Sequence, residues 1–399
     1  MKSLSERKTL YILAGALAGT GCIIMAIFPS IALESAQNGV LLWASSVLPA
    51  LLPFFICSNF MIALGVPELV GRLFEEPFRR IFGAPGASAF VFTISVFSGY
   101  PTGPKLIGDM GRRGEITPKE AKRMLTFCST SGPLFMLGAV GVGILYSSGA
   151  GVVIALSHYL GSIFNGILFR IFTGHSRREE FQGIKHTKRK TNNQARPGNI
   201  PQKNLLDIFT DSIVSSLKAM GIICGYIVLF TLITDFIQFS GILNLFQSGY
   251  TKGFIKGLFE MTVGCNSIGR VNDHQILLKS ILCSFLISFG GISVMAQSMS
   301  MLSNLRISIW YYLIVKLCHG ILAAGIAFLI GPYILSLDVI MTGTFDQFNM
   351  TKTLGWFSSL LFSTKAVIIV VILFVFTIFI DKLVTLLKRR FKASDTPSN

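Results

Sequence analysis

The sequence predicts an all-α polytopic membrane protein with about eight transmembrane helices and two re-entrant helical hairpins. The 399-residue chain is 51% hydrophobic and only 14% charged, whereas soluble domains carry about 25% charged residues. Apolar runs long enough to cross a bilayer as helices recur along the chain. Its formal net charge of +16 comes from lysines and arginines between and after these runs, as in cytoplasmic loops. Membrane lipid is therefore an expected partner, and nucleic acid is not.

The chain before the basic linker is predicted to contain an N-terminal crossing and then a first repeat with three further crossings. Residues 1–30 supply an N-terminal transmembrane helix over Leu10–Phe28. A signal peptide is the alternative, but the run is long for one and no small-residue cleavage site follows it. Residues 31–172 form a first gate-type repeat. Its expected helices are a span over Asn38–Leu64, an interfacial amphipathic helix over Pro67–Phe82, a broken span over 118–146 and a returning span over Gly149–Phe172.

A break in the first repeat predicts a re-entrant hairpin near residues 86–110. Glycine and proline recur within Ser98–Lys105, and such a stretch cannot continue a helix. The apolar run before it is too short to cross, and the charges after it belong on the cytoplasmic side. An ordinary cytoplasmic loop is the alternative. At membrane depth a broken helix is tolerated only against protein or a wet cavity, which is where transporters bind substrate.

A second break is expected inside the 118–146 helix. Thr117 and Pro118 have the residue types of a helix cap and of a first helical position. Farther along, Cys128-Ser129-Thr130-Ser131-Gly132-Pro133 places small polar residues and a Gly-Pro pair at bilayer depth.

The second half is expected to repeat this plan after a cytoplasmic linker over 173–204. Contact with anionic lipid is an alternative role for that basic linker. Residues 205–335 contain a hairpin near 253–273, broken over Gly264–Gly269, and a helix over 275–303, broken over Gly290–Ser293. Residues 336–399 supply the last transmembrane helix and a basic cytoplasmic tail. Three crossings in each half make the halves an inverted repeat, which is typical of secondary transporters.

The four breaks are predicted to meet near the midplane and to bind substrate there. Half-helix N-termini favour carboxylate or phosphate. Lys105 favours an anion if it faces the cavity, and the alternative is a lysine that snorkels to the interface. Lys316 and His319 share one helix face and form a candidate proton relay, or else a structural pair. The predicted substrate-binding residues are Ser98, Gly99, Tyr100, Thr102, Gly103, Lys105, Ser129, Thr130, Ser131, Asn266, Ser267, Ser293 and Gln297.

The sequence lacks the signatures of the common enzyme classes. No Walker motif, GxGxxG, HExxH or GxSxG occurs, so ATPase, nucleotide-binding and hydrolase activities are not expected. The seven cysteines lie singly, without a CxxC pair or a Cys/His cluster at metal spacing. Catalytic carboxylates or histidines are not clustered, which disfavours a lipid-modifying enzyme. We therefore expect no enzyme activity, no cofactor and no metal.

Four motifs carry a resemblance to a known family. They are Val47-Leu48-Pro49-Ala50-Leu51-Leu52-Pro53-Phe54, Ser98-Gly99-Tyr100-Pro101-Thr102-Gly103-Pro104-Lys105, Phe127-Cys128-Ser129-Thr130-Ser131-Gly132-Pro133-Leu134-Phe135 and the stretch from Gly290-Gly291-Ile292-Ser293-Val294 to Gln297. Over most of its length the chain resembles the YlbJ (SpoVV) sporulation integral membrane proteins. The resemblance implies the nucleoside-recognition gate-domain group, whose halves look like those of concentrative nucleoside transporters.

The resemblance also implies a role in endospore formation. That role is the export of dipicolinic acid from the mother cell across the outer forespore membrane, which is also the implied location in sporulating cells. A small planar dicarboxylate suits half-helix N-termini, hydroxyls and one lysine better than a neutral nucleoside does. A nucleoside or other organic-anion permease is one alternative. A non-transporting sporulation scaffold is another, although a scaffold does not need polar residues at all four breaks.

Overall fold

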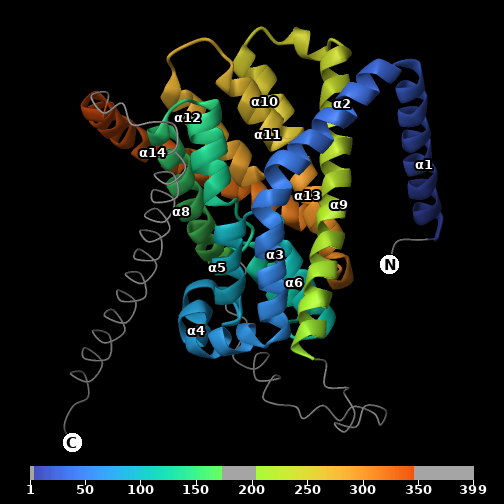
Figure 1. Ribbon diagram of the computed structural model, residues 1–399, viewed down its shortest axis with the longest axis vertical. Coiled ribbons are helices and arrows are strands. Elements are labelled where there is room, and N and C mark those ends of the chain that lie inside the picture. The colour runs from blue at the N-terminus through green and yellow to red at the C-terminus, as the bar shows by residue number, and fades with distance from the viewer. Residues whose placement is uncertain (1–3, 173–203, 346–399) are drawn as a thin grey trace, which may run out of the picture.

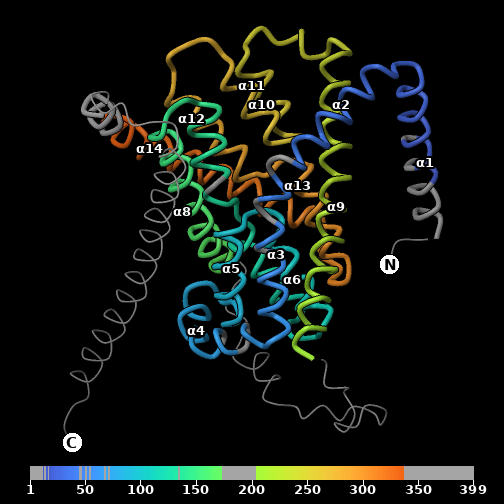
Figure 2. Tube along the Cα trace, viewed as in Figure 1, coloured from blue at the N-terminus to red at the C-terminus, as the bar shows by residue number. Residues whose placement is uncertain are grey.

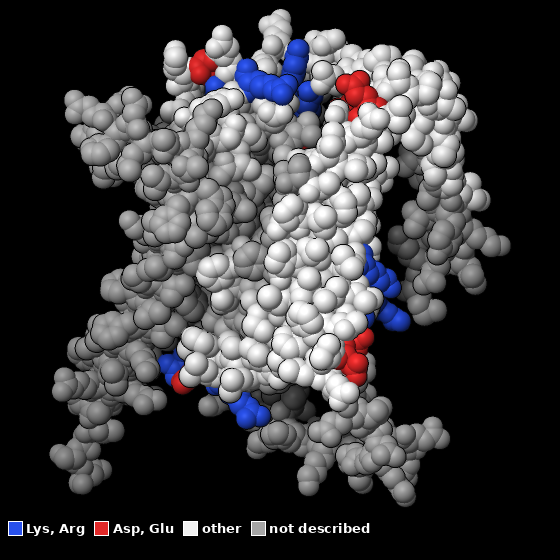
Figure 3. Space-filling model, in the orientation of Figure 1, with Lys and Arg blue, Asp and Glu red and all other residues white. Residues whose placement is uncertain are grey.

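The computed structural model describes residues 4–172 and 204–345, and within these ranges the chain is helical with no β-strand. Four helical stretches are long and apolar enough to cross a membrane, and a bent pair near the N-terminus brings the number to as many as five. Figure 3 shows a broad uncharged surface between two ends that carry most of the charged side chains of this face. The all-α membrane fold is confirmed. The count of about eight spans stays a prediction, and the last of these, Ser358–Ile380, lies outside the described residues.

The N-terminal segment forms a bent pair of helices that continues into a long helical run. α1 (Leu4–Ile27) and α2 (Pro29–Leu42) meet at Phe28 at an angle of 109°, and α1 stands apart from the other helices in Figures 1 and 2. The π-helical turn η1 (Trp43–Val47) joins α2 to α3 (Leu48–Ala63), so the predicted Asn38–Leu64 span is the second part of a longer helical run.

The first half has the hairpin and the broken helix that its glycines and prolines predict. The chain turns at Gly99-Tyr100-Pro101, and the helix after Pro118 stops at Leu125 and resumes at Leu134. Thr117 and Glu120 form a capping box at its start. The elements are α4 (Val66–Phe82), α5 (Ser88–Ser98), α6 (Thr102–Arg113), α7 (Pro118–Leu125), the π-helical η2 (Leu134–Ile144) and α8 (Ser148–Phe172). How deep the hairpin lies in a membrane stays a prediction.

The second half has the same order of hairpin and broken helix. The predicted break over Gly290–Ser293 is confirmed as the junction of two helices at Gly290. The elements are α9 (Leu205–Phe239), the short 3-10 turn η4 (Ile242–Leu245), α10 (Gly249–Phe259), α11 (Met261–Gly269), α12 (Ile276–Phe289), α13 (Gly291–Met301), the 3-10 turn η5 (Ser303–Leu305) and α14 (Ile309–Phe345).

The predicted break over Gly264–Gly269 is wrong, because these residues are helical and belong to α11. The hairpin turns earlier, at Glu260, whose carboxylate accepts a hydrogen bond from the Val263 N–H at 2.7 Å and caps α11. Gly264 serves close packing instead, since an added Cβ would lie 2.2 Å from the Cα of Gly257 on α10. Glycine here brings two helices together rather than ending one.

The helices pack as a large body beside a smaller layer. α14 lies along α8 and α12 in the body, while α2 and α3 pack against α9. The layer has its own apolar cluster, in which Phe55 of α3 contacts α9 residues that include Met220 and Ile223. In Figure 1 the α5–α6 hairpin lies in the lower half of the molecule and the α10–α11 hairpin in the upper half.

Candidate substrate-binding site

In each half, the tip of the hairpin packs directly against the break in the following helix. An added Cβ on Gly99, at the α5–α6 turn, would lie 2.5 Å from the Gly132 nitrogen in the α7–η2 break. An added Cβ on Gly291, at the α12–α13 break, would lie 3.1 Å from the Phe259 carbonyl oxygen at the α10–α11 turn. The hairpin tip and the next helix break therefore meet within each half, although the tip in the second half is the turn at Glu260 and not the predicted Gly264–Gly269.

The helix N-termini at these breaks are packed against backbone. An added Cβ on Gly103, in the first turn of α6, would lie only 1.7 Å from the carbonyl oxygen of Cys128. The neighbouring Thr102 hydroxyl is fully buried and has no hydrogen-bond partner among the described residues. In this conformation the first turn of α6 therefore contacts protein rather than open space, and a solute would need this packing to loosen before it reached the N–H groups.

A buried polar cluster joins the first hairpin to α14. Lys316 is 1% exposed, and its Nζ donates to the Tyr100 hydroxyl at 2.6 Å and to the Ser129 carbonyl at 3.1 Å. The Nδ1 of His319 lies 3.4 Å from the same Nζ, as their shared helix face predicts. Ser129 also pairs its hydroxyl with the Tyr312 hydroxyl at 2.7 Å. The hairpin turn, the α7–η2 break and α14 therefore meet at one lysine.

His158 of α8 extends this cluster to the second half. Its Nε2 accepts from the Ser131 N–H at 2.8 Å, so Nδ1 carries the proton and donates to the Ser288 hydroxyl at 2.7 Å. Tyr159 donates to the carbonyls of Val96 and Ser131, each at 3.1 Å. His158 thus links the break after α7 with the end of α12, just before the second break.

Other predicted site residues make local contacts. Thr130 pairs with the Ser95 hydroxyl at 2.9 Å, and the Ser98 hydroxyl donates to its own helix at Ile94. Gln297 donates to Ser293 at 3.2 Å on α13.

The structure does not bring Asn266 and Ser267 to the cluster. Both belong to the last turns of α11, beyond the Glu260 turn, and Asn266 is exposed. Ser267 and the next residue, Ile268, pack against Gly253 of α10. The misplaced break accounts for this error, because these two residues were expected at a hairpin tip and instead lie toward its base.

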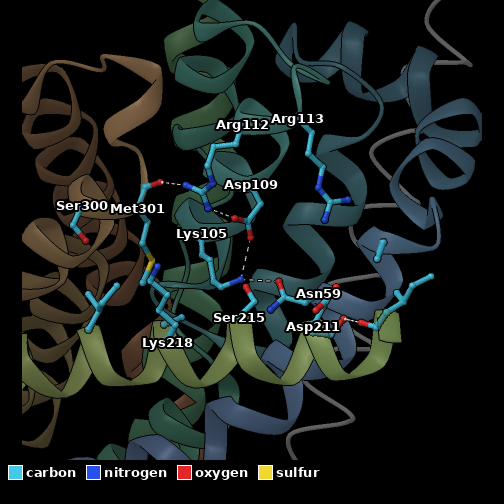
Figure 4. A pocket seen from close by; sticks show the side chains of 15 residues that line it. Asn59, Lys105, Asp109, Arg112, Arg113, Asp211, Ser215, Lys218, Ser300 and Met301 are labelled. Atoms are coloured by element: carbon cyan, nitrogen blue, oxygen red, sulfur yellow. Dashed lines mark hydrogen bonds and ion pairs between the residues drawn. The ribbon is translucent and has the colours of Figure 1, made fainter. Parts of the chain in front are cut away.

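Lys105 lines a cavity between α3, α6, α9 and α13 (Figure 4). The cavity has a volume of about 910 Å³. The Lys105 Nζ donates to the Asn59 amide oxygen at 2.7 Å and to Asp109 at 3.0 Å, and it lies 5.3 Å from the centre of the Phe55 ring. Asn59 in turn donates to the Ser216 hydroxyl at 2.8 Å, so it connects the hairpin helix to α9.

Cationic side chains outnumber carboxylates around this cavity. Arg112 pairs with Asp109 and also reaches the Met301 carbonyl at 3.4 Å. Lys218 projects from the middle of α9 and forms no ion pair with any described residue. The charged residues of the lining are Lys105, Arg112, Arg113, Lys218, Asp109 and Asp211, four cations against two anions. The lining therefore carries a formal surplus of two positive charges.

Sequence reasoning missed several of these residues. Lys218 gave a usable signal, because an ionisable side chain well inside an apolar helix marks a functional candidate. Asp109 also gave one, at the i+4 position from Lys105. No sequence signal marks Asn59, Tyr312 or Ser288, because their hydrogen-bond partners lie far away in the sequence. Within the described residues, no group of three or more His, Cys, Asp or Glu side chains is placed to hold a metal ion.

Comparison with known proteins finds a relative whose sequence matches this chain over most of both lengths. The chain is 32% identical over 348 residues to the "Sporulation integral membrane protein YlbJ" of Bacillus subtilis (strain 168), and the match covers 81% of this chain and 82% of that protein. No family model matches the chain. No solved structure matches it either.

Proposed function

Because the chain belongs to the YlbJ family of sporulation integral membrane proteins, we propose that it exports dipicolinic acid from the mother cell during endospore formation. The membrane it crosses is then the outer forespore membrane. The substrate is a small, planar, rigid dicarboxylate with two negative charges at neutral pH. The protein would transport this substrate without hydrolysing ATP. The energy would come from a gradient or from consumption of the solute on the far side of the membrane.

The cavity beside Lys105 is the observation that carries the proposal. Its surplus of two positive charges matches a dianion, and its volume of about 910 Å³ falls in the range of small-molecule sites. Asn59 and the serines of α9 and α13 add polar groups that can orient a solute. A neutral nucleoside has no need of Lys218, a lysine without an ion-pair partner among the described residues.

The arrangement of the hairpins supports a transporter. Each half contains a helical hairpin whose tip packs on the break of the next helix, and the two hairpins occupy opposite halves of the molecule in Figure 1. We take this as an inverted repeat in which α2–α3 and α7–η2 also cross the membrane. The four long apolar stretches, these two, α1 and the last predicted span then make a total of eight. Such repeats place substrate between broken helices in secondary transporters.

The direct test is transport by the purified protein in proteoliposomes. Labelled dipicolinate is expected to accumulate in vesicles that contain the protein, with uridine as the competing substrate and protein-free vesicles as the control. Uptake of uridine without uptake of dipicolinate would identify a nucleoside permease. Uptake of neither solute would leave the scaffold function as the better account.

Replacement of Lys105 tests the role of the cavity. Lys105→Gln keeps a polar chain of similar length but removes one positive charge and the charge-assisted bonds to Asn59 and Asp109. Dipicolinate transport should fall roughly tenfold, because hydrogen bonds to charged groups contribute about 1.5–3 kcal/mol. Membrane insertion should be unchanged. Lys252→Gln, at a lysine of α10 outside the cavity lining, is the matched control. Equal transport by both variants would assign Lys105 to a structural role.

A further inference from the structure

The contacts around Lys316 offer one acceptor to each N–H of a protonated ammonium. The Nε2 of His319 lies 2.9 Å from the carbonyl oxygen of His158 and must donate to it. The Nδ1 of this neutral ring is consequently an acceptor, and it faces Nζ at 3.4 Å. Tyr100 and the Ser129 carbonyl supply the two other acceptors. A lysine ammonium has three N–H donors, and here each one has a partner.

No opposite charge in the described part of the chain compensates this ammonium, although the centre of the Tyr100 ring lies 4.5 Å from its Nζ and adds a cation–π contact. All three acceptors are neutral groups, and no carboxylate of the described residues forms an ion pair with Lys316. A buried charge without an opposite charge is costly, and pairing lowers that cost only when an anion with good geometry is present. An anion beside this buried lysine would supply the missing opposite charge.

We propose that Lys316 is an inner carboxylate site, where a carboxylate of the solute displaces the Tyr100 hydroxyl from the ammonium. This inference rests on the proposed function, since it assigns a second position to the same substrate. The site is distinct from the Lys105 cavity but close to it along the chain, because Tyr100 precedes Lys105 by five residues in the same hairpin.

Tyr100 is the partner that an anion displaces most readily. His319 belongs to the same helix as Lys316, and Ser129 contributes a backbone carbonyl, so neither can leave without a larger rearrangement. The Tyr100 hydroxyl donates its own proton to the Ser288 carbonyl at 3.3 Å, and it can keep that bond when it no longer accepts from Lys316. The bond to the Tyr100 hydroxyl already has a charged donor. A carboxylate adds an opposite charge, so it also compensates the buried ammonium, which a neutral hydroxyl cannot do.

Displacement of Tyr100 also releases the hairpin turn from α14. The next residue back, Gly99, packs against Gly132, and Gly103 packs against the Cys128 carbonyl. Loss of the Lys316–Tyr100 bond therefore removes a tie that holds this close packing in place. Occupation of the inner site is expected to loosen the hairpin tip, and so to connect substrate binding with movement of the element that covers the site.

Binding measurements on the full-length protein in detergent test the inner site. Lys316→Met keeps the length of the side chain and removes its charge, and it should weaken dipicolinate binding at least tenfold in titration calorimetry. Tyr100→Phe removes the competing hydroxyl and should strengthen binding by several fold. Wild-type affinity in a folded Lys316→Met protein would overturn the proposal. Unchanged affinity in Tyr100→Phe would overturn the displacement, and that variant also serves if Lys316→Met does not fold.

The native Cys128 reports the movement of the hairpin. Its thiol is fully buried in the α7–η2 break, and the equally buried Cys265 and Cys283 lie in the second half. Dipicolinate should accelerate maleimide modification of Cys128, read by peptide mass spectrometry, in the wild type but not in Lys316→Met. Tyr100→Phe should react quickly without ligand. Parallel modification of Cys265 and Cys283 would indicate general loosening and count against the proposal.

A failure of the proposed function gives a different pattern. If the wild type neither binds nor transports dipicolinate, benzene-1,3-dicarboxylate and acetate serve as probes of the same lysine. Binding of such a carboxylate that depends on Lys316 and is strengthened by Tyr100→Phe would support the inner site without the dipicolinate assignment. If neither Lys316→Met nor Tyr100→Phe changes the binding of any of these carboxylates, the inner site itself is overturned.

Discussion

At the scale of single residues, a hydrogen bond between Tyr250 and Asp273 joins the base of the second hairpin to the loop before α12. The Tyr250 hydroxyl donates to the Asp273 carboxylate at 2.5 Å, and the Gln275 N–H donates to the same oxygen at 3.1 Å. These bonds, chiefly the one from Tyr250, lower the pKa of Asp273. Burial first, and then the bond to Asp273, raises the pKa of Tyr250. The pair is therefore stable as neutral phenol and ionised carboxylate.

These pKa shifts predict a pH window for the stabilisation. A lowered carboxyl pKa contributes stability above the ordinary value of about 4, and this contribution is lost as the pH falls through the lowered value. The raised phenol pKa contributes below the ordinary value of about 10 and is lost at higher pH. Asp273→Asn should lower the Tm of the detergent-solubilised protein at pH 7. The difference from wild type should shrink toward pH 3, and a difference that stayed constant would contradict this account.

At the scale of elements, the close approach of α10 and α11 depends on glycine. An added Cβ on Gly264 would meet the Gly257 Cα at 2.2 Å, and one on Gly257 would meet the Leu286 side chain at 2.3 Å. The first contact is with backbone, which cannot move aside as a side chain can. The second hairpin is therefore held together by backbone packing that tolerates no side chain at Gly264.

Alanine substitution at Gly264 tests this packing. Gly264→Ala should destabilise the protein by about 1–3 kcal/mol, the usual cost of overpacking, and should lower the Tm and the monodisperse yield in detergent. Gly221→Ala in α9 is the matched control, because an added Cβ there meets nothing within 4 Å. The control should be neutral or slightly stabilising, since alanine is the better helix former. Equal behaviour of the two variants would contradict the packing argument.

The same elements show what local sequence can predict. Gly99 and Pro101 mark the first turn because proline and a left-handed glycine are incompatible with a continuing helix, and the break at Gly290 is marked in the same way. The turn at Glu260 carries no such signal, while the glycines after it pack instead of breaking the helix. The Lys316–Tyr100 bond joins residues 216 positions apart. No local pattern determines such a contact, because it depends on how the helices are placed in space.

At the scale of the whole molecule, the two hairpins and their loops define two ends. The turn between α6 and α7 follows the basic end of α6. The short turn η4 follows the C-terminal end of α9, which lies at the top of Figure 1. The distribution of lysine and arginine predicts that the α6–α7 end is cytoplasmic. The α9–α10 connection is then on the outer side of the membrane.

Cysteine labelling can check this orientation. Lys119→Cys, at an exposed position of α7, should react with a membrane-impermeant maleimide only after the cells are permeabilised. Asn244→Cys, at an exposed position of η4, should react in intact cells. Peptide mass spectrometry separates the introduced thiols from the native ones. The reverse pattern would invert the topology and move the Lys105 cavity to the outer side.

Asn59 also bears on how the cavity can change size. Its amide bridges Lys105 on one side of the cavity and Ser216 on the other, where the apolar cluster of α3 and α9 meets the larger body. A space at the seam between two separately packed cores can widen or narrow while each core keeps its own contacts. The free energy needed to widen this cavity is then mainly that of breaking a few polar bonds, such as those of Asn59. A polar solute can replace these bonds with its own.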